Sequence, residues 1–319
     1  MQTPTSDLSR RAFLAGALAT AGGAVSGCSV PAVSDPTGPG QAESTASARS
    51  ASGQSSSASA SPSSTAATTS VQPRPDPSTA AKTATASEII QRATVPVLCY
   101  HQLRNWRKGD SQYSRFNLIC PPRYFRAQLD ALADDGWTTI SPDQYLAHLN
   151  TGAKLPRKPV ILSFDDASAG HATEGLTQLV KRGMTGTFFV MTVVLGKPGW
   201  LSTRDVKRLA HAGMTIGSHT WDHHAVSDLS GGDWKVQLEQ TRDALRKASG
   251  QPVEHFAYPY GVVSKKAFPH LSDAGYRTAF QLEAKKLDPS VPLYTLRRSI
   301  AVSTWSGASL LKHLSKQRP

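Results

Sequence analysis

The 319-residue sequence has only three cysteines available for disulfide bonds, and it has no apolar run long enough for a transmembrane helix. Its longest apolar N-terminal stretch, Ala15 to Ala24, is shorter than the roughly 20 residues of a transmembrane helix. Acidic residues are also under-represented, with 23 Asp and Glu against 35 Lys and Arg. No nucleic-acid-binding motif or internal repeat is visible, so the basic balance fits an anionic polymer, a membrane surface or simply a solvated face.

The first 92 residues look like an export signal followed by a spacer. Arg10-Arg11 begins a twin-arginine pattern, and Val25 to Cys28 resembles a bacterial lipobox. We expect residues 1–28 to direct twin-arginine export and Cys28 to anchor the protein by lipid to the outer face of the cytoplasmic membrane; an ordinary cleaved signal is the alternative. Residues 29–92 are mostly Ser, Ala, Thr, Pro and Gly, a composition that predicts a disordered tether.

The remaining residues, 93–319, are expected to form one folded domain, and they carry 29 Lys and Arg against 18 Asp and Glu. Cys99 and Cys120 lie in this domain. Export permits a disulfide between them. A buried free thiol is equally ordinary for Cys99, because it lies in an apolar strand.

Short apolar runs alternate with amphipathic stretches throughout this domain. Strands are expected at 96–100, 137–140, 160–164, 187–191, 214–217, 254–257, 276–281 and 293–302. Helices are expected at 124–133, 143–149, 173–181, 203–211, 233–248, 265–273 and 308–314. About seven strand–helix units in this length predict an α/β fold with a parallel sheet, and favour a distorted (β/α) barrel over an open sheet.

Chemically active side chains follow several of these strands at their carboxyl ends, where barrels gather their functional groups. Asp165 and Asp166 end the apolar run 160–164, and His101 follows the first strand. His219 and the segment Tyr258 to Tyr260 follow two later strands. A pair of buried carboxylates is costly unless it is paired or bound to a metal, so this coincidence predicts a functional site.

A mononuclear metal centre is the simplest interpretation of these residues. Catalytic zinc commonly has three protein ligands and one open position, and Asp166, His219 and His223 supply that number. Two imidazoles and a carboxylate also suit non-haem iron. The second carboxylate, Asp165, favours hydrolysis because it could accept a proton from a metal-bound water.

Three motifs in residues 95–305 resemble the NodB-like polysaccharide deacetylases, metal-dependent carbohydrate esterases that remove N-acetyl groups from sugar polymers. These motifs are Ser163 to Ala167, Ser218 to His223 and Phe256 to Gly261. The opening Val95 to His101 is similar to the subgroup that includes biofilm poly-N-acetylglucosamine deacetylases.

The resemblance implies a role for each matching residue. Asp165 would be the base, Asp166, His219 and His223 the metal ligands, and the backbone N–H of Tyr260 a donor to the oxyanion. Two departures stand out: Ala257 occupies the place of an Arg that steadies the base in many members, and Ala167 replaces a Gly.

The general acid and the second imidazole ligand each have two candidates. His101, at a strand end, is the better acid candidate, and His313 in Leu311-Lys312-His313 is the other. His224 could replace His223, since some relatives space the pair one residue wider.

The sequence therefore predicts a hydrolase that uses Zn²⁺, or another divalent ion such as Co²⁺ or Mn²⁺, to deacetylate an N-acetylglucosamine-containing wall or exopolysaccharide. The alternatives are an O-acetyl esterase on a wall glycan such as xylan, and a degenerate glycan-binding lipoprotein. No protein partner can be inferred.

Overall fold

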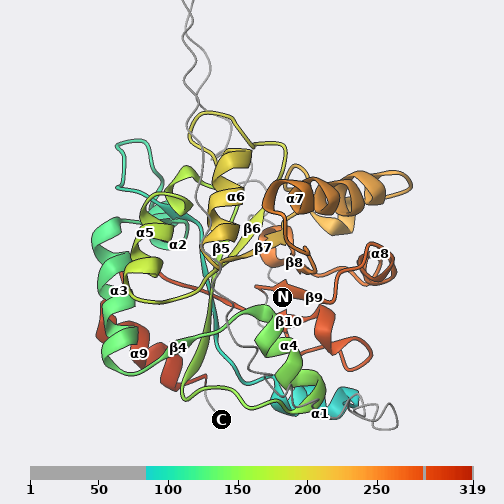
Figure 1. Cartoon of the computed structure of the whole chain (residues 1–319), viewed down its shortest axis with the longest axis horizontal. Helices are drawn as coiled ribbons and strands as arrows, with labels where there is room; N and C mark the ends of the chain where they lie inside the picture. The colour runs from blue at the N-terminus through green and yellow to red at the C-terminus, as the bar shows by residue number, and fades with distance from the viewer. Residues whose placement is uncertain (1–83, 283–284, 318–319) are drawn as a thin grey trace, which may run out of the picture. The chain divides into compact units, whose positions relative to one another are not determined.

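The computed structural model describes residues 84–282 and 285–317. The export signal, Cys28 and most of the predicted tether lie outside these residues. The described residues form an α/β fold around one parallel sheet, in the order β10-β9-β8-β7-β6-β5-β1-β11, with β4 pairing to β5 (Figure 1). The predicted barrel of strand–helix units is confirmed.

The larger sheet contains β1 Val97–Tyr100, β4 Thr138–Thr139, β5 Pro159–Asp165, β6 Thr187–Val190, β7 Thr215–Ser218, β8 His255–Ala257, β9 Thr278–Gln281, β10 Leu296–Arg297 and β11 Ser299–Ile300. A small separate sheet pairs β2 Gln102–Leu103 with β3 Ile119–Cys120.

The helices are α1 Ala86–Arg92, α2 Gln112–Asn117, α3 Pro122–Asp134, α4 Pro142–Thr151, α5 Glu174–Lys181, α6 Thr203–His211, α7 Thr241–Ser249, α8 Ala267–Asp273 and α9 Gly307–Ser315. Shorter 3₁₀ turns are η1 Ala169–His171, η2 Val226–Asp228, η4 Pro259–Gly261 and η5 Pro292–Tyr294, and η3 Lys235–Gln240 is a π-helical stretch that leads into α7.

The barrel is nearly closed by one split strand rather than by the continuous strand predicted at 293–302. β10 pairs with β9, whereas β11 pairs with β1 at the opposite end of the strand order. A single residue, Arg298, separates the two halves, and its N–H donates to Gln281 O at 3.0 Å. The chain thus changes partners at Arg298 and bridges the two edges of the sheet.

Side chains alternate between the inside of the barrel and the layer under the helices, as the pleat of a strand requires. On β5, Val160, Leu162 and Phe164 join the main core cluster, whereas Ile161 joins a second cluster with residues from β6, β8, β9 and β10. The same alternation places Ser163 and Asp165 on the inner side with Ile161. The inner side therefore changes from apolar to polar toward the carboxyl ends of the strands.

The predicted boundary of the tether at residue 92 is wrong, because residues 86–92 form α1. Thr85 caps this helix, with its hydroxyl accepting from Glu88 N–H while the Glu88 carboxylate accepts from Thr85 N–H. The pair is a capping box, which satisfies donors at the start of a helix. Ile89 is buried in the second core cluster, so the helix belongs to the folded domain.

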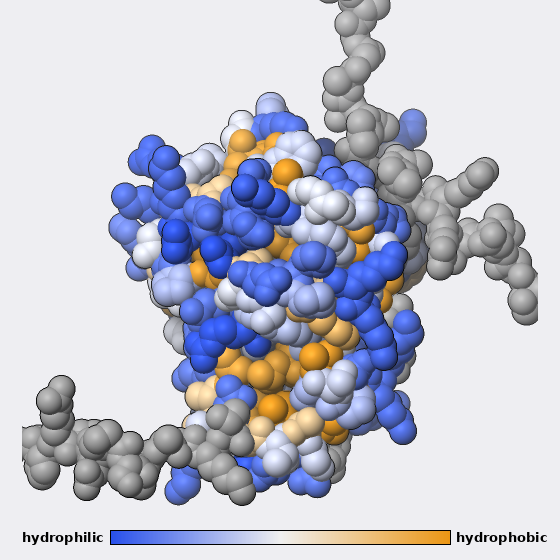
Figure 2. Space-filling view, turned by 90° about the vertical axis from the view of Figure 1, so that its right-hand side faces the viewer, coloured by the Kyte–Doolittle hydropathy of each residue, from blue (hydrophilic) through white to orange (hydrophobic). Residues whose placement is uncertain are grey.

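None of the helices formed by the described residues is long and apolar enough to cross a membrane. On the face shown in Figure 2, hydrophilic residues predominate in the upper part and hydrophobic residues gather in the lower part. Cys99 and Cys120 are buried and both are free thiols, so the permitted disulfide is not formed.

Candidate metal centre

Asp165 and Asp166, at the end of β5, differ in backbone conformation and in their main partners. Asp165 continues the strand and is 1% exposed, inside the barrel. Asp166 has a left-handed backbone, with φ of 77°, which turns its side chain out of the strand direction. Both carboxylates still approach His219, whose Nε2 lies 3.4 Å from Asp166 Oδ1 and 3.9 Å from Asp165 Oδ2.

Asp166, His219 and His223 converge on one point. Asp166 Oδ1 lies 3.4 Å from Nε2 of both His219 and His223. One possible ligand atom from each residue lies within 4.8 Å of the others. Two ligands of a tetrahedral zinc ion with bonds of about 2.0–2.1 Å would be about 3.3–3.4 Å apart, so the spacing fits such an ion.

The Asp166 oxygen that faces the imidazoles supports the same conclusion. Asp166 Oδ1 is buried and has no hydrogen-bond partner within the described residues. An unsatisfied buried carboxylate oxygen is costly, and a cation between it and the imidazoles would remove that cost.

His219 is fixed in the orientation that a metal ligand needs. Its Nδ1–H donates to Ala257 O at 2.8 Å, so Nε2 faces Asp166 with its lone pair. His224 turns away: its Nδ1 lies 2.8 Å from Asp222 Oδ1, and its side chain is 59% exposed. Of the two candidates, His223 is the one that the fold directs toward Asp166.

Asp165 is held by Arg298. The guanidinium donates to both carboxylate oxygens, at 2.7 and 2.8 Å, and to Ser163 Oγ at 3.1 Å. The Arg298 side chain is fully buried, and the ion pair is therefore screened little by solvent. This arginine occupies the role left open by Ala257, and it comes from the split strand between β10 and β11.

The charges around Asp165 also set its proton affinity. Burial raises the pKa of Asp165, but Arg298 and His219 lower it by more, and the net pKa is about 2. Burial likewise raises the pKa of Asp166, while His219 and His223 hold it below its usual range. Burial is also the main reason why the pKa of His223 is lowered to about 4. Both carboxylates are therefore ionised and His223 is neutral at neutral pH, as metal ligation requires.

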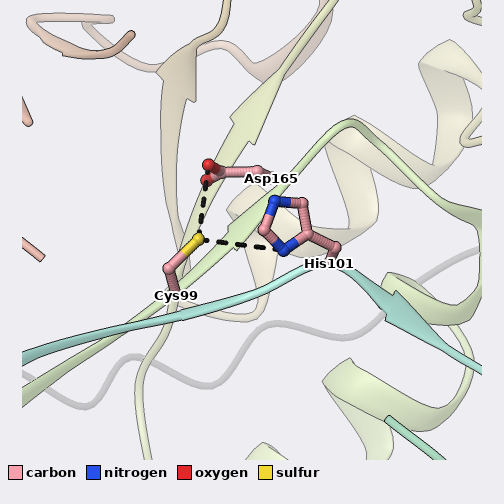
Figure 3. A group of neighbouring side chains, drawn as sticks. All are labelled: Cys99, His101 and Asp165. Atoms are coloured by element: carbon pink, nitrogen blue, oxygen red, sulfur yellow. Dashed lines mark hydrogen bonds between the residues drawn. The ribbon is translucent and has the colours of Figure 1, made fainter. Parts of the chain in front are cut away.

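Cys99 lies between Asp165 and His101, as Figure 3 shows. Its Sγ is 3.4 Å from Asp165 Oδ2 and 4.0 Å from His101 Nδ1. Burial raises the pKa of Cys99 well above its usual value, so it remains a thiol that donates to the carboxylate. His171 Nε2–H donates to His101 O and so fixes the backbone of His101. His101 is thus brought to the Asp165 side of the site.

His313 has different neighbours. It lies on α9, with Nε2 3.1 Å from Ser299 Oγ and its ring 4.5 Å from the ring of Trp305. Tyr260, in contrast, belongs to the site: its ring lies 4.5 Å from that of His223, at 73°.

Left-handed backbone conformations gather in the three motif segments. Six non-glycine residues in the described part of the chain have positive φ, and five of them are Asp166, Ala167, Thr220, His223 and Tyr260. Such conformations are strained and accumulate at functional sites. The value of 69° at Ala167 explains why a glycine suits this position.

A carboxylate–imidazole cluster beside an anchored second carboxylate, at the carboxyl ends of barrel strands, is an arrangement that could hold a metal ion and serve hydrolysis. Comparison with known proteins agrees. Residues 152–279 match the family model described as polysaccharide deacetylase. The chain therefore contains a polysaccharide deacetylase domain, and its homologues are hydrolases that act on amides.

Two curated relatives illustrate the family. The peptidoglycan-N-acetylglucosamine deacetylase PgdA of Listeria monocytogenes is 27% identical over 51% of this chain and 36% of its own length. The poly-β-1,6-N-acetyl-D-glucosamine N-deacetylase of Staphylococcus aureus is 24% identical over 54% of this chain and 64% of its own length. The chain thus spans less than two thirds of either relative.

Among solved structures, the Streptococcus pyogenes deacetylase PplD in complex with acetate superimposes with a TM-score of 0.63. It is 24% identical, and the match covers 69% of this chain and 97% of PplD. At this identity the likeness shows the fold.

Arg298 is the site residue that the sequence analysis missed. It lies outside the matched residues 152–279 and in a predicted strand with a neighbouring arginine, Arg297. One signal was available: Leu296 and Arg298 are two residues apart, so an inward Leu296 implies an inward Arg298.

Proposed function

We propose that this protein removes N-acetyl groups, as acetate, from an N-acetylglucosamine-containing cell-wall or exopolysaccharide. The observation that supports this proposal is that the two adjacent aspartates at the end of β5 have different main partners. Asp166 Oδ1 lies 3.4 Å from two imidazoles, whereas both carboxylate oxygens of Asp165 accept from the Arg298 guanidinium and Asp165 Oδ2 is 3.9 Å from His219 Nε2.

Asp166, His219 and His223 would hold the divalent ion, for which Zn²⁺ is our first choice and Co²⁺ or Mn²⁺ are alternatives. When bound, such an ion lowers the pKa of its water and polarises the amide carbonyl. Asp165 then accepts the proton of the attacking water. Arg298 fixes the carboxylate in one orientation, so Asp165 needs no rearrangement to accept it.

The remaining groups act on the two ends of the scissile amide. The backbone N–H of Tyr260 would donate to the developing oxyanion. His101 would deliver a proton to the departing amine, because its ring lies on the Asp165 side of the site. The contacts of His313 with Ser299 and Trp305 make it the weaker candidate for the acid.

Peptidoglycan and poly-N-acetylglucosamine are the substrates to test first. The Listeria relative is named for peptidoglycan and the Staphylococcus relative for poly-N-acetylglucosamine. The twin-arginine pattern and the lipobox support a place on the outer face of the cytoplasmic membrane, from which either polymer could be reached.

The test is acetate release by the purified chain from N-acetylglucosamine oligomers, peptidoglycan and an O-acetylated xylan. We expect release from the N-acetylated substrates, loss with a chelator and recovery with Zn²⁺. Asp165→Asn should keep the metal and lose most activity. Release from O-acetylated xylan alone would instead identify an esterase, and metal-independent glycan binding without any release would identify a binding protein.

A further inference from the structure

Trp221 lies between the two imidazole ligands in the chain and exposes its ring. It follows His219 by two residues and precedes His223 by two, and it is 42% exposed. All six tryptophans of the chain lie among the described residues, and Trp221 is the only exposed one. A tryptophan gains much by burial, so a ring left in solvent at this position is unexplained by folding.

The backbone around this exposed ring is held firmly. Trp221 N–H donates to Gln237 Oε1 at 3.0 Å, and Trp221 O accepts from Val193 N–H at 2.8 Å. Gln237 is 6% exposed, and its Nε2 donates to Asp222 Oδ1 at 2.9 Å. A buried glutamine thus uses both ends of its amide to fix two successive residues.

The segment is also held in an unfavourable backbone conformation. Thr220 and His223, on either side, have φ of 64° and 70°. Thr220 Oγ1 accepts from His223 N–H at 3.0 Å, which closes the turn. The fold therefore presents an exposed indole from the segment that joins His219 and His223, and this segment cannot easily relax.

We propose that Trp221 is a sugar-stacking subsite that receives the pyranose ring next to the reacting acetamide. The inference rests on the proposed deacetylase function and adds a residue that recognises the sugar ring of its substrate. β-Linked gluco-configured hexosamines carry their substituents equatorially, so each ring offers a flat face of axial C–H groups to an aromatic ring. A galacto-configured sugar has an axial O4 that interrupts this face.

A second exposed ring borders the same ligand. Tyr260 is 37% exposed, and its ring contacts that of His223. His223 therefore contacts an exposed aromatic ring from η4, and the segment between β7 and η2 that carries His223 also exposes the ring of Trp221. This arrangement suits a polymer that passes over the site better than a small acetylated molecule.

The first experiment compares Trp221→Ala and Trp221→Phe with the control Val180→Ala, which removes exposed apolar surface from α5. The substrates are an N-acetylglucosamine tetramer and p-nitrophenyl acetate. Stacking of one ring predicts that Trp221→Ala loses about 3- to 10-fold more kcat/KM on the tetramer than on the ester, mainly through KM. Trp221→Phe should recover part of this loss, and Val180→Ala should change neither reaction.

The second experiment measures binding without turnover, in the Asp165→Asn background. Tetramers of N-acetylglucosamine and N-acetylgalactosamine are titrated by calorimetry. The N-acetylglucosamine tetramer should bind more tightly than the N-acetylgalactosamine tetramer. Trp221→Ala should lower the affinity for the N-acetylglucosamine tetramer about 3- to 10-fold and reduce the difference in affinity between the two tetramers. Equal losses on tetramer and ester, or an unchanged affinity in Trp221→Ala, would overturn the subsite. Failure of the proposed function would look different: weakened glycan binding in Trp221→Ala without any acetate release by the wild-type chain.

Discussion

Replacing Arg298 by Met should destabilise the domain in a pH-dependent way. The substitution keeps much of the aliphatic volume but leaves Asp165 buried without its bidentate partner. Removing one member of a buried ion pair costs about 3–5 kcal/mol. The pKa of Asp165, about 2, lies below the unfolded value of about 3.9, so its ionisation contributes roughly 2–3 kcal/mol to stability at neutral pH, with Arg298 as the main favourable cause.

The sign of the pH dependence follows from the direction of each shift. The pKa of Asp165 is lowered in the folded wild-type chain, so its stabilisation is present above about pH 4 and is lost as the pH falls toward 2. In Arg298→Met, burial would leave the pKa of Asp165 raised. The variant should therefore lose stability as the pH rises above about 4, where the unfolded chain releases the proton first.

The measurement is urea unfolding of chelator-treated protein at pH 4 and pH 7, with acetate release measured on metal-loaded protein. Arg297→Met is the matched control, because Arg297 is exposed and adjacent. We expect a larger stability loss at pH 7 than at pH 4 for Arg298→Met alone, and an activity loss of about 100-fold from a misplaced base. The stability and the activity of Arg298→Lys should lie between those of the wild-type chain and those of Arg298→Met. An equal loss at both pH values would mean that packing, not the ion pair, accounts for the effect.

Three further predictions concern residues whose roles the sequence left open. His223→Ala should lose the bound metal, whereas His224→Ala should keep it, as metal analysis after dialysis would show; the reverse result would reassign the ligand. His101→Ala should lower kcat by about 100-fold, while His313→Ala should leave kcat unchanged; a loss of kcat in His313→Ala alone would move the acid to α9. Cys28→Ala should shift the protein from the membrane fraction to the soluble fraction of the envelope, and unchanged membrane retention would argue against a lipid anchor at Cys28.

The main features of the fold were predictable because the chain repeats one unit. Apolar runs end in polar residues at Asp165, Ser218 and Tyr258, and parallel strands bring such ends to one edge. The sequence could therefore predict that distant motifs meet. Their mutual distances depend on left-handed turns at Asp166 and His223, which no periodicity indicates.

Two features were missed for physical reasons. α1 has a Thr85–Glu88 capping signal, but its surroundings are so rich in Ala, Ser and Thr that composition favoured a tether. Arg298 was hidden because an inward arginine near the end of a strand is improbable until its partner is known. The sequence identified Asp165 as the base but showed no side chain that orients it. The need for such a cationic partner was the available indication of Arg298.

The split strand between β10 and β11 makes the order of chain synthesis matter for activity. Residues 166–223 can gather their carboxylate and imidazoles once the central strands are assembled. The Arg298 guanidinium that orients Asp165 is in place only when the last segment has paired with both edge strands, β9 and β1. On the proposed mechanism, a chain whose final segment has come loose would keep Asp166, His219 and His223 together but lack the arginine that orients Asp165.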